Sequence, residues 1–66
     1  MITLDKQFGT FYDIFMKARN IAKELDTEVC FPFNGVDFVV WEGSVLKRPF
    51  EIEDYVKHHQ GKEVRI

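Results

Sequence analysis

The sequence has 66 residues and a mass of 7.8 kDa, so we expect a single domain over residues 1–66. Its composition, 45% hydrophobic and 15% aromatic, is typical of a chain with a packed core and argues against disorder. The formal net charge of −2 argues against a general nucleic-acid binder and against a polybasic membrane anchor. The lone cysteine excludes an internal disulfide, and the first residues lack the apolar run of a signal peptide. We therefore expect a cytoplasmic protein that does not bind membranes.

The clearest predicted element is a helix over residues 11–25. Thr10 precedes it and Asp13 follows three positions later, a spacing that resembles a capping box. Apolar residues then recur at helical spacing and form one broad stripe, which consists of Phe11, Ile14, Phe15, Ala18, Ile21, Ala22 and Leu25. Such a stripe predicts that the helix packs on an apolar surface.

Residues 28–41 are predicted to form a β-hairpin. Asn34-Gly35 lies between two runs rich in β-formers, and this dipeptide favours a type I′ turn because both central residues need positive φ. The two-residue turn sets the cross-strand pairs as Phe33–Val36, Phe31–Phe38 and Val29–Val40. All six residues are apolar and share one face, which supports this register over a slipped one.

Two further expectations concern the edges of the sheet. Pro32 stands opposite Asp37, where its missing N–H would point away from the hairpin partner, so residues 28–33 are predicted to form an edge strand. The second neighbour of strand 36–41 is then expected to be residues 45–47, reached through the turn at residues 42–44.

A second, shorter helix is predicted over residues 50–60. Pro49 suits a first helical turn, and Gly61 suits the position after the last one. Residues 1–4 form a short apolar tract and residues 63–66 a short terminal segment, and the assignment of either as a strand stays open. The sequence thus predicts an α+β domain in which a small antiparallel sheet packs against two helices, in the order α-β-β-(β)-α.

No residues converge on a catalytic or metal-binding pattern, so we expect a protein without enzymatic activity, cofactor or metal. His58 and His59 are neighbours on a helix and point about 100° apart, which does not suit chelation of one metal. A reactive Cys30 would need a cation or a helix N-terminus to stabilise its thiolate. It lies instead in a predicted strand between Val29 and Phe31, with Val39 across the hairpin, and is expected to be inert. Abnormal titration of Cys30 or of the histidines would be the signature of an enzyme.

The second face of the hairpin is the predicted binding surface. It carries an apolar strip of Cys30, Pro32, Val39 and Trp41, bordered by Glu28 and Asp37. A central tryptophan with a charged rim has the composition of a protein interface. Coverage of this face by the second helix or the chain ends is the alternative. The candidate binding residues are therefore Trp41, Val39, Cys30, Pro32 and Asp37.

Two segments resemble small uncharacterised proteins encoded by phages and prophages, in which a helix precedes a Phe-Asn-Gly-Val hairpin. These segments are the helix end at residues 21–24 and the run Phe-Pro-Phe-Asn-Gly-Val-Asp-Phe at residues 31–38. The resemblance covers about residues 11–41 and transfers no catalytic residue. It implies an accessory protein in a bacterial cytoplasm that binds a host or phage protein.

Taken together, these features predict a non-enzymatic accessory protein that binds a protein partner or itself, as a homodimer, through the face around Trp41. The alternative is a nucleic-acid-associated module that uses Lys47, Arg48 and the aromatic residues of the sheet. Such a module would bind oligonucleotides with a steep dependence on salt.

Overall fold

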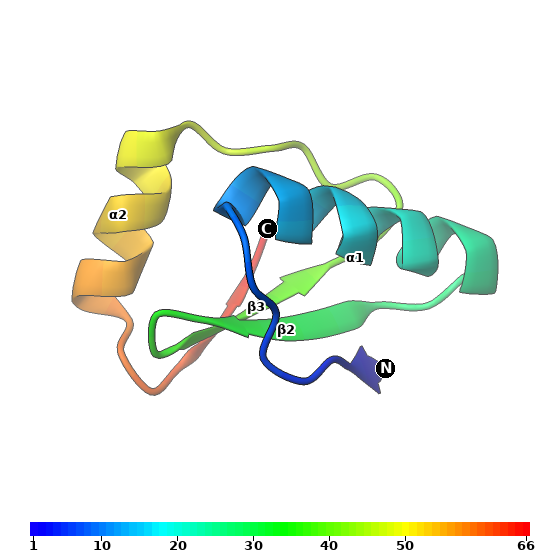
Figure 1. Cartoon of the computed structure of the whole chain (residues 1–66), viewed down its shortest axis with the longest axis horizontal. Coiled ribbons are helices and arrows are strands. Elements are labelled where there is room, and N and C mark those ends of the chain that lie inside the picture. Colours follow the sequence, from blue (N-terminus) through cyan, green and yellow to red (C-terminus); the bar gives the residue numbers. More distant parts are fainter.

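The computed structural model describes residues 1–66 and confirms the α+β fold class (Figure 1). Helix α1 lies over one face of the sheet, and α2 lies beyond the hairpin turn. The elements in chain order are β1 (Ile2–Thr3), α1 (Phe11–Leu25), β2 (Val29–Phe33), β3 (Val36–Val40), α2 (Pro49–His58) and β4 (Glu63–Arg65).

Helix α1 has the predicted bounds and the predicted start. The Thr10 side chain accepts a hydrogen bond from the Asp13 N–H at 3.2 Å, which satisfies one of the free donors of the first turn. The helix ends at Asp26, whose left-handed backbone (φ 49°) turns the chain towards β2. The predicted apolar stripe faces the sheet except at its last residue, Leu25, which is exposed.

The hairpin register is confirmed. β2 and β3 pair antiparallel, with Phe31 opposite Phe38 and Pro32 opposite Asp37. Asn34 and Gly35 have φ values of 48° and 87°, so both turn residues adopt the left-handed backbone that the short turn requires.

The prediction that residues 28–33 form an edge strand is wrong. β1 pairs parallel with the first part of β2, where Ile2 lies opposite Val29 and Thr3 opposite Cys30. This pairing needs carbonyl acceptors from residues 28 and 30, and β1 ends before it reaches Pro32. The missing N–H of Pro32 therefore limits the length of the extra strand without preventing it.

The predicted strand at residues 45–47 is also wrong, and the sheet is mixed instead of purely antiparallel. The second neighbour of β3 is β4, which pairs parallel with it in a four-stranded order β1-β2-β3-β4. A tight turn redirects the chain after β3, because the Ser44 hydroxyl accepts the N–H of Trp41 at 2.9 Å and the Ser44 N–H returns to the Trp41 carbonyl at 3.0 Å. The chain then passes α1 and reaches α2 (Figure 1).

Helix α2 begins one residue earlier and ends two residues earlier than predicted. Pro49 occupies its first turn, and a Glu51 carboxylate oxygen accepts the N–H of Arg48 at 2.9 Å. After the helix, the Gln60 side-chain amide donates to the Asn34 carbonyl at 2.7 Å. The end of α2 is thereby fastened to the hairpin turn.

The core lies between α1 and the face of the sheet that carries the six paired apolar residues. Phe38 is fully buried, and its ring lies 5.0 Å from that of Phe11, 5.8 Å from that of Phe31 and 6.4 Å from that of Tyr55. α2 contributes Ile52 and β4 contributes Val64 to the same cluster. Neither helix has the length and hydrophobicity needed to cross a membrane.

Phe38→Ala tests this core. Because Phe38 is surrounded by α1, β2 and α2, its removal leaves a cavity that should lower the free energy of unfolding by about 3–5 kcal/mol. Urea titration followed by circular dichroism measures this loss. Phe8→Ala is the matched control, since Phe8 is 88% exposed and should change stability by less than about 0.5 kcal/mol. Equal midpoints for the two variants would contradict the packing described here.

Candidate functional site

The register places the predicted strip on the face of the sheet opposite α1. Cys30, Val39 and Asp37 share this face because their neighbours Phe31 and Phe38 point into the core. Cys30 and Val39, however, are only 5% and 1% exposed. The centre of the predicted binding strip is therefore not accessible to a partner.

A polar bridge covers this part of the sheet. Arg65 of β4 lies opposite Val39 and forms an ion pair with Glu28, at the start of β2, and a second contact with Glu63 at 3.5 Å. Since β3 lies between β4 and β2, the Arg65–Glu28 pair must cross β3 on the face that carries Val39. The C-terminal segment thus covers Cys30 and Val39, which agrees with the alternative that a chain end covers the second face of the hairpin. The cover is a charged side chain and not a layer of apolar residues.

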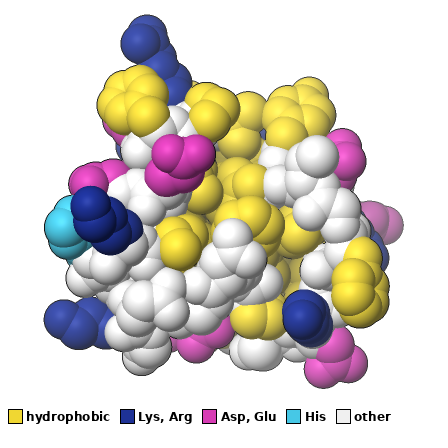
Figure 2. Space-filling model, turned by 60° about the vertical axis from the view of Figure 1, so that its left-hand side comes forward, with side chains coloured by type: hydrophobic (Ala, Val, Ile, Leu, Met, Phe, Trp, Pro, Cys, Tyr) yellow, Lys and Arg dark blue, Asp and Glu magenta, His cyan; other side chains and the backbone are white.

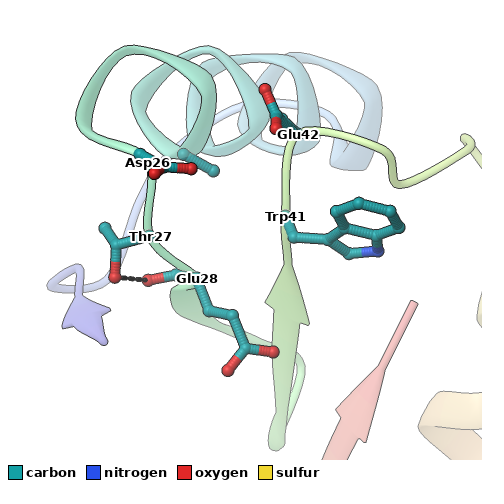
Figure 3. A pocket seen from close by; sticks show the side chains of 6 residues that line it. Asp26, Thr27, Glu28, Trp41 and Glu42 are labelled. Carbon is teal, nitrogen blue, oxygen red and sulfur yellow. Dashed lines mark hydrogen bonds between the residues drawn. The ribbon is translucent and has the colours of Figure 1, made fainter.

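Trp41 is 54% exposed and stands apart from the covered strip. It follows the last residue of β3, and its indole ring packs against the backbone of Gly43 in the turn that begins at Trp41. The contact is so close that a Cβ added at Gly43 would lie 2.3 Å from the ring. Figure 3 shows the indole pointing away from Asp26 and Thr27. The adjoining hollow has a volume of about 260 Å³, and three carboxylates, from Asp26, Glu28 and Glu42, lie along it.

The side chains considered for chemistry do not converge. Burial raises the pKa of the Cys30 thiol above its ordinary value, and the carboxylates of Asp37 and Glu63 raise it further. His58 is exposed and lies 3.3 Å from Asp54 on the same helix face, whereas the ring of His59 packs against Tyr55. No set of three His, Cys, Asp or Glu side chains is arranged as metal ligands.

The largest hollow is a groove between the N-terminal ends of the two helices, with a volume of about 480 Å³. Figure 2 shows a band of hydrophobic side chains on the side of the molecule where α2 comes forward. We call this hollow the helix groove. Its apolar lining consists of Phe11, Tyr12, Phe33, Leu46, Pro49 and Ile52, and its polar lining of Thr10, Asn34, Lys47 and Glu53.

Exposed apolar side chains occur in the lining of the helix groove and next to lining residues in the chain. Phe50 follows the groove residue Pro49 and is 63% exposed, Tyr12 is 54% exposed, and Val45 is also exposed. No spacing in the sequence marks these residues as a site. A signal was present for one of them, because Phe50 is a large aromatic residue that does not belong to the apolar positions by which α2 packs on the core, which are Ile52, Tyr55 and Val56.

The chain matches no protein-family model, no curated protein and no solved structure. The basis for a functional proposal is therefore the geometry of its own residues.

Removal of the Arg65 side chain tests the cover over the strip. We expect iodoacetamide to alkylate Cys30 slowly in the folded protein and several-fold faster in Arg65→Ala, because the charged bridge no longer shields the thiol. The exposed ion pair should contribute less than about 1 kcal/mol to stability, so the fold should persist. Lys62→Ala is the control, and an equal alkylation rate in the two variants would show that Arg65 does not protect Cys30.

The pH dependence of the same reaction tests the electrostatics around Cys30. The thiolate is the reactive form, so the raised pKa places the rise in alkylation rate at higher pH than for an exposed cysteine. Asp37→Asn should shift this profile to lower pH, whereas Asp54→Asn on α2 should leave it unchanged. Because the pKa is raised on folding, the protonated thiol stabilises the fold below the ordinary thiol pKa. This contribution is lost as the pH rises through the raised value.

Proposed function

We propose that this chain is a non-enzymatic accessory protein that binds a protein partner through the helix groove. The observation that supports this proposal is a groove of about 480 Å³ with a mainly apolar lining, together with two exposed aromatic residues. Tyr12 lies in the lining, and Phe50 follows the lining residue Pro49 in the chain. Soluble proteins rarely expose a contiguous apolar surface of this kind unless it is an interaction site.

A protein partner suits the helix groove better than a small molecule. Small-molecule sites enclose most of their ligand and orient it with a few buried polar groups. The groove is open, and Thr10, Asn34 and Glu53, three of its four polar lining residues, are exposed. An apolar centre with a polar, solvated rim is the usual anatomy of a protein–protein interface.

The two surfaces considered from the sequence support the proposal less. The face around Trp41 offers one exposed indole beside buried Cys30 and Val39. For the nucleic-acid alternative, Phe31 and Phe38 are fully buried and cannot stack on bases, and Trp41 borders a hollow lined by carboxylates. A cytoplasmic location and a phage or prophage origin remain predictions from the sequence.

Site-specific photo-crosslinking tests the proposed surface. A benzophenone amino acid at position 50 keeps an aromatic group beside the helix groove, and the same amino acid at position 41 is the matched control at the other predicted surface. After irradiation in a lysate of bacterial cells that produce the protein, we expect covalent adducts with protein from position 50 and few from position 41. Adducts from position 41 alone, or from neither position, would overturn the proposal.

A further inference from the structure

We infer that the partner in the helix groove is a second copy of this chain, and that Phe50 of each copy inserts into the groove of the other. This inference rests on the proposed function, because it names the occupant of the same groove. In a two-fold dimer the same surface is used by both copies, so the chain must carry both the inserted group and its receptor. Phe50 and the helix groove meet this requirement.

Phe50 has no role within the single chain. It lies in the first turn of α2 and is 63% exposed, while Ile52 two residues later is the side chain by which α2 enters the core. Its neighbour in the chain, Pro49, lines the helix groove, so Phe50 follows directly on the groove lining. An exposed aromatic side chain and an apolar groove large enough to hold it are what reciprocal insertion requires.

The charges in the helix groove are self-complementary. Lys47 and Glu53 both line it, one of each sign, and neither forms an ion pair within the chain. A two-fold axis through the groove brings Lys47 of one copy towards Glu53 of the other, so the dimer contains two equivalent Lys47–Glu53 contacts. A foreign partner would need its own matching pair, whereas a second copy supplies it.

The exposed apolar area suits a small dimer interface. An aromatic side chain presents about 150–250 Å² when fully uncovered. At their exposed fractions, Phe50 and Tyr12 therefore each expose on the order of 100 Å² of apolar surface. Val45 and Leu46 together expose about the same area as that pair. An interface at the small end of the specific range buries about 600 Å² on each partner, a little over half of it apolar. The area matches, and we expect a dimer that dissociates on dilution.

Sedimentation equilibrium of the purified chain, from micromolar to millimolar concentration, tests the dimer. We expect the average mass to rise from 7.8 kDa towards twice that value. Phe50→Ala should weaken association about tenfold or more, since it removes the inserted anchor. Phe8→Ala removes a still more exposed aromatic residue at another site and should have no effect. The helical circular dichroism of each variant confirms that it is folded.

A charge exchange tests the pairing itself. Lys47→Glu alone places like charges together twice, and so does Glu53→Lys alone, so each variant should be monomeric where the original chain is dimeric. An equimolar mixture of the two variants pairs opposite charges at both contacts and should recover the dimer. A mixture that stays monomeric would overturn the inference.

The outcomes separate this inference from the proposed function. A chain that stays monomeric at millimolar concentration while position 50 crosslinks to a different protein would refute the dimer and leave the helix groove as the binding site. A dimer that Trp41→Ala dissociates and Phe50→Ala does not, together with crosslinked adducts from position 41 alone, would refute both. A crosslinked product of twice the chain mass from position 50 would support both.

Discussion

The turn at Asn34-Gly35 is the constraint on which the remainder of the molecule depends. Two consecutive residues with positive φ allow the hairpin to close in two residues, and this length fixes which residues of β2 and β3 face α1. The Gly35 carbonyl accepts the N–H of Gly61, and the Asn34 carbonyl accepts from Gln60, so the same turn holds the segment between α2 and β4. A Cβ at Gly35 would lie 2.2 Å from the end of the Gln60 side chain, so a larger residue there would displace Gln60 from the turn. Sheet register and the position of α2 thus share one origin.

The parts of the fold that local sequence determines could be predicted, whereas the parts that depend on distant contacts could not. Helix α1 and the hairpin follow from apolar spacing, a cap and a turn dipeptide, all within a few residues. The pairing of β3 with β4 depends on two distant events. The hydrogen bonds of Ser44 turn the chain away after β3, and the N–H of Gly61 later binds the Gly35 carbonyl and brings the chain back beside β3. A two-residue strand such as β1 has no periodicity to recognise. Its pairing depends on the acceptors that β2 offers.

The candidate site shows the same division. The sequence placed Cys30, Val39 and Asp37 on one face correctly, because alternation along a paired strand is a local property. It could not show that Arg65, 26 residues after Val39 in the chain, would lie beside that residue and pair with Glu28. Nor could it show the helix groove, whose lining comes from α1, β2, the loop before α2 and α2 itself. A surface assembled from four separate segments carries no spacing that marks it.

The two faces of the sheet explain why exposed apolar residues remain at the N-terminal ends of the two helices, among them Tyr12 and Phe50. α1 and α2 both contribute to the core face, and the opposite face is closed by long charged side chains that hydrogen-bond across the strands. The second face of the sheet is thus covered without a third layer of secondary structure, for which a chain of 66 residues has little material. This arrangement leaves α2 attached through Ile52, Tyr55, Val56 and the hairpin turn, with the aromatic residue Phe50 exposed. Burial of the helix groove against a second copy would add apolar contacts to α2, of which only Ile52 is buried in the single chain. Association would therefore stabilise α2 more than any other element, because ligand binding stabilises the state that binds it.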